Sequence, residues 1–184
     1  MSTHIRAALS VLALVLAVLV FVSPGLQAAQ AAKDSAEVTT LLADAKSEAE
    51  QLKMDTAEME TFTRSKLNWK TFASKITLIK EHVNNIGELT SKLNNARGSG
   101  SPWQQQAIDR INPLLQELAT NVGATINHLN EHQSLVHSAH YKEYVETNHQ
   151  LATDLASLIS DYVDYGKTKD RMEALSKDLE TPER

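Results

Sequence analysis

Histidine is the residue in this chain whose spacing most suggests chemistry, because four of the seven histidines fall within thirteen residues. His128 and His132 are four residues apart, so on a helix both imidazoles share one face, as two ligands of one metal ion require. With a third ligand from His137 or His140, the cluster would form a zinc, copper or nickel site. The simpler interpretation, which we favour, is that these are solvated side chains that bind no metal.

The rest of the chain offers few of the groups that catalysis uses. It contains no cysteine, which excludes disulfides, cysteine nucleophiles, thiolate metal sites and covalent haem attachment. No H-E-x-x-H zinc motif, no duplicated E-x-x-H set of the di-iron type and no Gly-rich phosphate loop is present. The sequence therefore predicts that the protein is not an enzyme and has no built-in cofactor.

A non-covalent haem is one further cofactor hypothesis, because helical bundles can hold haem between a histidine and a methionine. His149 with Met54 or Met59 is the pair that could do so in this chain. His149 lies one residue past the apolar positions of its helix, so we expect it to face water. The pattern therefore argues against haem at this position.

The N-terminus is typical of a secretory signal peptide. The basic start MSTHIR precedes sixteen uncharged residues at 7–22, and Pro24-Gly25 precedes the small-residue segment LQAAQAA. We expect cleavage after Ala28 or Ala31, so residues 1–31 are assigned to the signal peptide and the protein to the periplasm or the medium. The alternative is retention as a membrane anchor, for which sixteen residues is short of the usual span of about 20.

The charge balance excludes one class of partner. The chain carries 23 acidic and 18 basic residues, with a pI near 5.8, and has no block of Lys and Arg. Nucleic-acid binding depends on a basic surface that neutralises phosphates. We therefore expect no nucleic-acid partner.

Apolar residues recur at steps of three and four through residues 32–184, which is the period of amphipathic helices. The expected helices cover residues 34–66, 68–97, 102–133 and 138–180. The apolar pattern shifts by one residue between the first two, which requires a turn or a sharp kink near residues 64–68. The third pattern continues through Pro113, which predicts a kinked helix and no break there.

Two helix starts carry capping signals. Ser101, Pro102 and Gln104 supply an N-cap residue, a proline in the first turn and the glutamine of a capping box. Asp34, with Glu37 three residues later, has the same spacing and predicts the first N-cap.

Four amphipathic helices joined by short connections predict an all-α fold, an up-down-up-down antiparallel four-helix bundle in a single domain over residues 32–184. The alternative is a long kinked first helix followed by a helical hairpin. That arrangement would expose an apolar face and would dimerise through it.

One end of the predicted bundle has polar residues at core positions. Thr125, His132 and Asn148 fall on the apolar patterns there, and Tyr141 lies beside them. Such an end could form a small-ligand pocket. The alternative, which we favour, is a bundle end that simply contacts water.

These observations favour an exported, non-enzymatic bundle that acts through protein contacts, as a scaffold, adaptor or chaperone-like module, with a protein partner or a second copy of itself. In size, export signal and helicity the chain is similar to periplasmic helical chaperones of the Spy type, although it lacks their L-T-x-x-Q motif. The alternatives are a metal- or haem-binding bundle that uses His128 and His132, and a small-ligand sensor domain. After cleavage we expect no stable membrane anchor.

Overall fold

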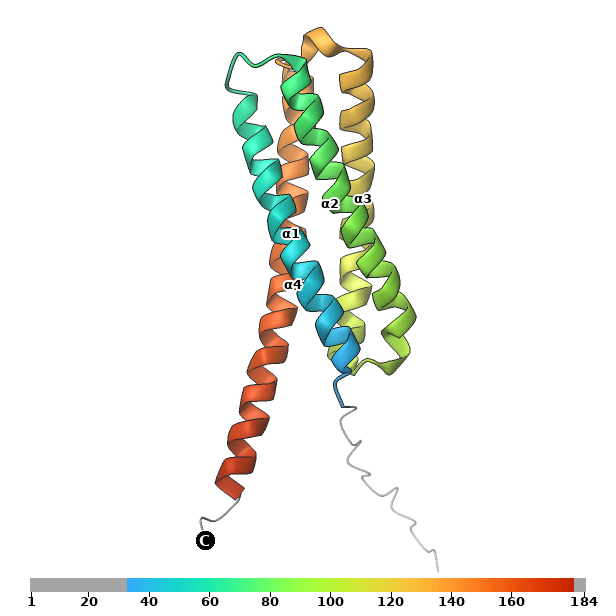
Figure 1. The fold of residues 1–184 in the computed structure, drawn as a ribbon, viewed down its shortest axis with the longest axis vertical. Coiled ribbons are helices and arrows are strands. Elements are labelled where there is room, and N and C mark those ends of the chain that lie inside the picture. The colour runs from blue at the N-terminus through green and yellow to red at the C-terminus, as the bar shows by residue number, and fades with distance from the viewer. Residues whose placement is uncertain (1–32, 181–184) are drawn as a thin grey trace, which may run out of the picture. The chain divides into compact units, whose positions relative to one another are not determined.

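The computed structural model describes residues 33–180, which form four helices packed side by side (Figure 1). Each helix packs against two neighbours, because α1 contacts α2 and α4 while α3 also contacts α2 and α4. No strand is present in this part of the chain, so the expected four-helix bundle is confirmed. The predicted signal peptide, residues 1–31, lies outside the described residues. The elements are α1 (Ala36–Phe62), α2 (Trp69–Ala96), α3 (Pro102–Glu131) and α4 (Ala139–Glu180), with 3₁₀ turns at Arg97–Ser99 and Gln133–Leu135.

The connection between α1 and α2 is a full reversal of the chain, so the alternative of one long kinked helix is wrong. α1 ends at Phe62, where backbone bonds of the tighter i to i−3 type close its last turn. Asn68 then caps α2, since its side-chain oxygen accepts a hydrogen bond from the Lys70 amide at 2.9 Å. The shift in the apolar pattern between the two segments reflects this turn.

The two predicted caps have different outcomes. The capping box at the start of α3 is confirmed, because Gln104 Oε1 accepts from the Ser101 amide at 3.0 Å. The N-cap of α1 is Ser35, and the prediction of Asp34 is wrong by one residue. Asp34 instead accepts hydrogen bonds from Trp103 Nε1 at 2.8 Å and Lys169 Nζ at 2.9 Å. Because Asp34 has these partners on α3 and α4, Ser35 is left to cap the helix.

Gln104 joins the beginnings of α1 and α3. Its side chain is fully buried, and Oε1 accepts from the amides of both Ser35, at 2.8 Å, and Ser101, at 3.0 Å. Its Nε2 donates to the Ser35 carbonyl at 2.9 Å and to Thr39 Oγ1 at 3.0 Å. One glutamine therefore satisfies polar groups at two helix ends, which fixes the relative position of those ends.

α3 remains continuous through Pro113, as the uninterrupted apolar pattern predicts. The Asn112 side chain donates from Nδ2 to the Ile108 carbonyl at 3.0 Å, just before the proline. It also exchanges two hydrogen bonds with Asn94 of α2, each 3.0 Å long. The irregular turn of α3 is thus supported by side-chain hydrogen bonds.

α4 buries two adjacent rows of residues, one that includes Leu151, Leu155 and Leu158 and one that includes Val145 and Val163. Tyr144 and Tyr162 are only half-buried and Tyr165 is 53% exposed, whereas Val145 and Val163 are buried. The spacing of three and four fits two adjacent rows of residues on this helix. The structure buries members of both rows, because α4 packs against both α1 and α3.

α4 is much longer than the other helices. It contains 42 residues, compared with 27, 28 and 30 in α1, α2 and α3. Its C-terminal part continues past the end of the bundle (Figure 1), and every residue from Asp170 to Glu180 is exposed. We refer to residues 167–180 as the α4 arm. Within residues 33–180 no helix has both the length and the apolar character needed to cross a membrane.

Candidate functional site

Three of the four clustered histidines come together at the end of the bundle where α3 gives way to α4. The ring of His128 lies 4.9 Å from the ring of His132 and 5.3 Å from that of His140, measured between centroids. It also stacks on Tyr141 at 5.5 Å. Burial, together with the neighbouring His132 and His140, lowers the pKa of His128 below its ordinary value. Its Nε2 is buried without a hydrogen-bond partner, so the neutral ring is the form that fits this position.

The predicted position of His132 is wrong, and His137 is bonded elsewhere. His132 was placed on the core face of α3, but α3 ends at Glu131 and His132 is an exposed residue beyond it. The helix ends there because His132 leaves the helical conformation, with φ of −134°. His137 contacts the connection between α1 and α2 and the start of α2. Its Nε2 lies 2.9 Å from the Leu67 carbonyl and its ring packs edge-on against Phe72. His137 therefore joins the α3–α4 connection to the α1–α2 connection.

The geometry does not assemble a complete metal site. Across residues 33–180, no group of three or more His, Asp or Glu side chains is placed so that it could hold a metal ion. The rings of His128, His132 and His140 meet edge to face, an arrangement typical of aromatic packing. Metal binding by these residues stays a prediction that needs a change in side-chain conformation.

Two residues of the predicted ligand pocket, Thr125 and Asn148, form a hydrogen-bonded network with Asn121 inside the bundle. Asn148 is buried, donates to Thr125 Oγ1 at 2.8 Å and accepts from Asn121 Nδ2 at 2.8 Å. Tyr141 is fully buried outside this network, its hydroxyl has no hydrogen-bond partner, and burial raises the pKa of that hydroxyl. His132 lies outside this network, on the surface. A ligand here would have to displace hydrogen bonds that the protein makes with itself, so the pocket stays a prediction.

A polar network between α1 and α2 was not predicted. His82 lies between two carboxylates, with Nδ1 2.9 Å from Glu48 Oε2 and Nε2 3.1 Å from Asp55 Oδ2. Lys75 Nζ contacts Asp55 Oδ1 at 3.1 Å and Glu58 Oε2 at 2.7 Å. Burial alone would lower the pKa of Lys75, but the hydrogen bonds to Glu58 and Asp55 raise it. These groups hold one another, and the network joins the two helices.

The sequence did carry a signal for this network. His82 and Lys75 are seven residues apart on α2, and Glu48 and Asp55 are seven residues apart on α1. Residues with that spacing beside two apolar faces are the ones that form ion pairs between packed helices. Considered one helix at a time, these carboxylates resemble ordinary solvated residues.

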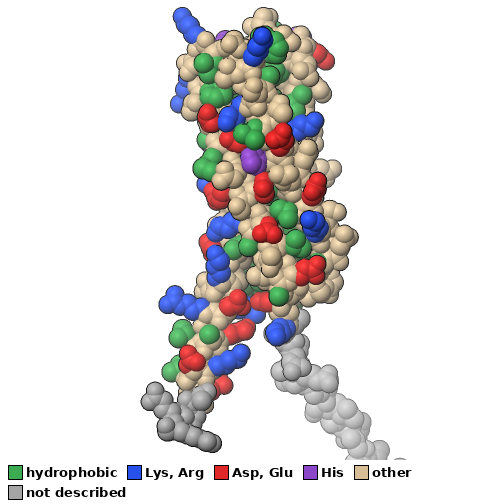
Figure 2. Space-filling view, viewed as in Figure 1, with side chains coloured by type: hydrophobic (Ala, Val, Ile, Leu, Met, Phe, Trp, Pro, Cys, Tyr) green, Lys and Arg blue, Asp and Glu red, His purple; other side chains and the backbone are tan. Residues whose placement is uncertain are grey.

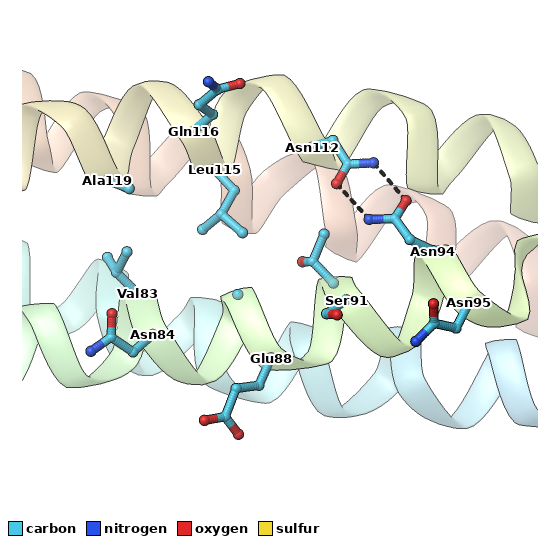
Figure 3. Close-up of a pocket in the computed structure, with 12 residues that line it drawn as sticks. Val83, Asn84, Glu88, Ser91, Asn94, Asn95, Asn112, Leu115, Gln116 and Ala119 are labelled. Atoms are coloured by element: carbon cyan, nitrogen blue, oxygen red, sulfur yellow. Dashed lines mark hydrogen bonds between the residues drawn. The ribbon is translucent and has the colours of Figure 1, made fainter.

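A polar groove of about 830 Å³ runs between α2 and α3 (Figure 3). Val83 and Leu115 point toward each other across it, and the paired amides of Asn94 and Asn112 close one end. The hydroxyl of Thr90 is buried in its wall without a hydrogen-bond partner. Amides, hydroxyls and a single carboxylate line the groove, so it offers hydrogen bonds but no nucleophile with a neighbouring base.

An aromatic hollow of about 460 Å³ lies between α3 and α4 at the other end of the molecule from the histidines. Trp103 and Tyr165 meet edge to face at 5.4 Å, and the Arg110 guanidinium lies 5.9 Å from the ring centroid of Tyr162. Gly166 makes this packing possible, because a Cβ there would lie 2.9 Å from Cη2 of Trp103. The indole therefore lies directly on the α4 backbone.

An apolar stripe leads from this hollow along the α4 arm. Met172, Leu175 and Leu179 are 67%, 53% and 87% exposed, and Tyr165, which is 53% exposed, belongs to both the hollow and the stripe. Figure 2 shows hydrophobic side chains on the protruding part of the helix, between charged residues of both signs. The members of the stripe are Tyr165, Thr168, Met172, Leu175 and Leu179. Large apolar side chains in a row on a helix surface commonly mark a contact site.

The chain matches no protein-family model, and neither a curated protein nor a solved structure matches it.

Proposed function

We propose that this is an exported, non-enzymatic helical-bundle protein that acts through protein contacts, as a scaffold, adaptor or chaperone-like module. The apolar stripe on the α4 arm carries the proposal. Burial of a Leu or Met side chain stabilises a complex by about 1.5 to 3 kcal/mol, and the arm leaves Met172, Leu175 and Leu179 uncovered. A helix that presents an apolar row to a groove or to another helix is a common mode of protein recognition.

The polar clusters of the bundle support a role without catalysis. Both ring nitrogens of His82 are occupied by carboxylates of α1, and Asn148 is bonded to Thr125 and Asn121. A catalytic base needs a free position within hydrogen-bond reach of a substrate proton. These groups instead join the helices. Hydrolase or redox turnover by the purified protein would contradict the proposal.

Export is supported by the N-terminal sequence pattern alone. Mass spectrometry of the protein recovered from cells tests it. We expect a mature chain that begins at Ala29 or Ala32, following cleavage after Ala28 or Ala31. A chain recovered from the cytoplasm with its first 31 residues intact would contradict export with cleavage.

Site-specific photo-crosslinking in cells tests the contact surface. A photoreactive residue at position 175 should give discrete crosslinked species, and Met172→Asp should remove them because it places a charge within the stripe. The matched control is position 92, an exposed lysine on α2 outside the stripe, which should give none. Equal crosslinking at both positions, or none at position 175, would contradict the proposal.

Metal binding is a second candidate function, and one observation favours it. Three imidazoles lie together, and Nε2 of His128 is buried with no hydrogen-bond partner. Calorimetric titration with zinc, copper and nickel should then give heat that His128→Phe removes and His137→Ala leaves unchanged. No heat with any of the three metals would exclude this candidate.

A further inference from the structure

We propose that the α4 arm pairs with the arm of a second copy of this chain in an antiparallel coiled coil. This inference rests on the proposed function, since it names the partner of the same surface. The spacing of the stripe is its first support. Tyr165, Thr168, Met172, Leu175 and Leu179 follow one another at steps of three, four, three and four, which are the a and d positions of a heptad. The arm therefore presents the a and d face of a coiled-coil helix, and within residues 33–180 no other helix covers that face.

Antiparallel pairing brings the apolar side chains of two arms into layers. In the register we propose, Met172 of each copy lies opposite Leu175 of the other. Leu179 of each copy then lies opposite Thr168 of the other, which gives four layers in total. These are a-to-d layers, the knobs-into-holes arrangement of a coiled coil. All the large apolar side chains of the arm are covered in this register.

Charge complementarity selects this register. In an antiparallel coiled coil the g positions of one helix lie near the g positions of the other, and such flanking residues set partner and orientation. Arg171 and Asp178 are the g positions of the arm. In the proposed register Arg171 of each copy lies beside Asp178 of the other, so two ion pairs flank the apolar layers. On the other flank Lys169 lies near Ser176, which is also compatible.

The alternative arrangements lose these pairs. A slip of one heptad toward the bundles would set Arg171 against Arg171 and Asp178 against Asp164. A parallel arrangement would set Arg171 beside Ser176 and would force the two bundles together at one end. The arm of 14 residues is about 20 Å long, and antiparallel pairing sets the two bundles at opposite ends of the paired helices.

The end of the second arm would reach the aromatic hollow. In the proposed register Leu179 of the second copy packs on Thr168, one helical turn from Tyr165 and Trp103. Those two rings lie together at 5.4 Å and Tyr165 is half-exposed, so they offer an apolar surface there. The stripe and the hollow thus form one continuous surface that a single partner helix covers.

A membrane surface fits the arm less well than a second copy. The arm carries four basic and four acidic residues, so its net charge is zero. Helices that lie on anionic membranes carry an excess of Lys and Arg on their polar face. The residues are Lys167, Lys169, Arg171 and Lys177 with Asp170, Glu173, Asp178 and Glu180.

Sedimentation velocity tests the pairing on the chain as recovered from cells. The contact is small, so the series should run from about 1 µM to about 1 mM at low ionic strength, where exposed ion pairs are least screened. We expect a monomer that becomes a dimer as concentration rises. Leu175→Asp should remain monomeric throughout, and Leu78→Asp, an exposed leucine on α2, should dimerise as the parent does.

Two charge reversals test the register. Arg171→Asp and Asp178→Arg should each weaken the dimer by about tenfold, because each turns two attractive contacts into two repulsive ones. An equal mixture of the two variants should dimerise at least as well as the parent, since every Asp at 171 or 178 then meets an Arg. The double variant should also regain the parent affinity. A mixture no tighter than either variant alone would overturn the proposed register.

The outcome also separates this inference from the proposed function. A parent chain that stays monomeric up to about 1 mM overturns self-pairing. If crosslinking at position 175 then captures a different protein, the arm still acts as a contact surface and the proposed function stands. If position 175 also gives no crosslink, both proposals fail.

Discussion

Replacement of Gln104 by alanine is the most direct test of how the bundle is held at the end where α1 and α3 begin. Truncation removes five hydrogen bonds, which join Gln104 to Ser35, Thr39 and Ser101. The Ser101 amide would remain buried without a partner, since Ser101 is only 2% exposed. An unsatisfied buried group costs about 1 to 3 kcal/mol. Ser35 is half-buried, so water can replace part of its loss.

We therefore expect Gln104→Ala to lower the free energy of unfolding by about 3 kcal/mol, including the capping box and the space left behind. For a domain of this size that corresponds to a fall in Tm of about 6 to 12 °C. Urea unfolding followed by far-UV circular dichroism measures the change. Gln104→Met fills the space but makes none of the hydrogen bonds, so it should retain about two thirds of the loss, near 2 kcal/mol.

A second glutamine, two residues further along α3, provides the control. Gln106 lies on the same turn but is exposed, so Gln106→Ala should change the free energy of unfolding by less than about 0.5 kcal/mol. If Gln104→Ala and Gln106→Ala prove equal within that margin, the buried amide does not hold the two helix ends together. If Gln104→Met is as stable as the parent, packing and not hydrogen bonding is responsible.

Three further predictions concern stability. Leu118→Ala should cost about 2 to 5 kcal/mol in urea unfolding, because Leu118 is fully buried, whereas Leu175→Ala in the arm should cost less than about 0.5 kcal/mol in the monomer. The pKa of His128 is lowered from its ordinary 6.5, so as the pH falls the unfolded chain binds a proton at His128 before the folded chain does. The free energy of unfolding should therefore fall as the pH drops below 6.5. His128→Phe should reduce that fall in unfolding curves measured between about pH 7 and pH 5. Burial raises the pKa of Asp34, but hydrogen bonds from Ser101, Lys169 and Trp103 bring it below its ordinary 3.8. Asp34 therefore stabilises the fold above pH 3.8 and loses this effect as the pH falls through its folded pKa. Asp34→Asn should lower stability at pH 7, and its difference from the parent should shrink as the pH falls below 3.8.

Local signals in the sequence were sufficient to predict the architecture. The capping box at Ser101 and Gln104 located the start of α3, and the shifted apolar pattern located the reversal before Trp69. These features depend on residues a few positions apart, so they can be interpreted without knowledge of the neighbouring helices. The order of the helices then followed from short connections.

The errors arose where a neighbouring helix decides the outcome. Tyr144 and Val145 satisfy the helical period equally well, and only the packing of α4 between two helices buries Val145. His132 continues the pattern of α3, but the helix ends one residue earlier. The contact between His82 and Glu48 joins residues 34 positions apart, and no spacing within one helix predicts it.

The α4 arm also has a consequence for how its helix forms. The last 11 residues of α4, from Asp170 to Glu180, are all exposed, so local contacts such as the Lys169–Glu173 ion pair at 3.0 Å help to hold them helical. Helices shorter than about 12 to 15 residues are marginal in water, because nucleation is costly. Here the bundle supplies the nucleus, so the arm should fray progressively from Glu180 back toward Gly166. Amide exchange should be graded along the arm, and a partner that covers the stripe would extend the ordered helix as it binds.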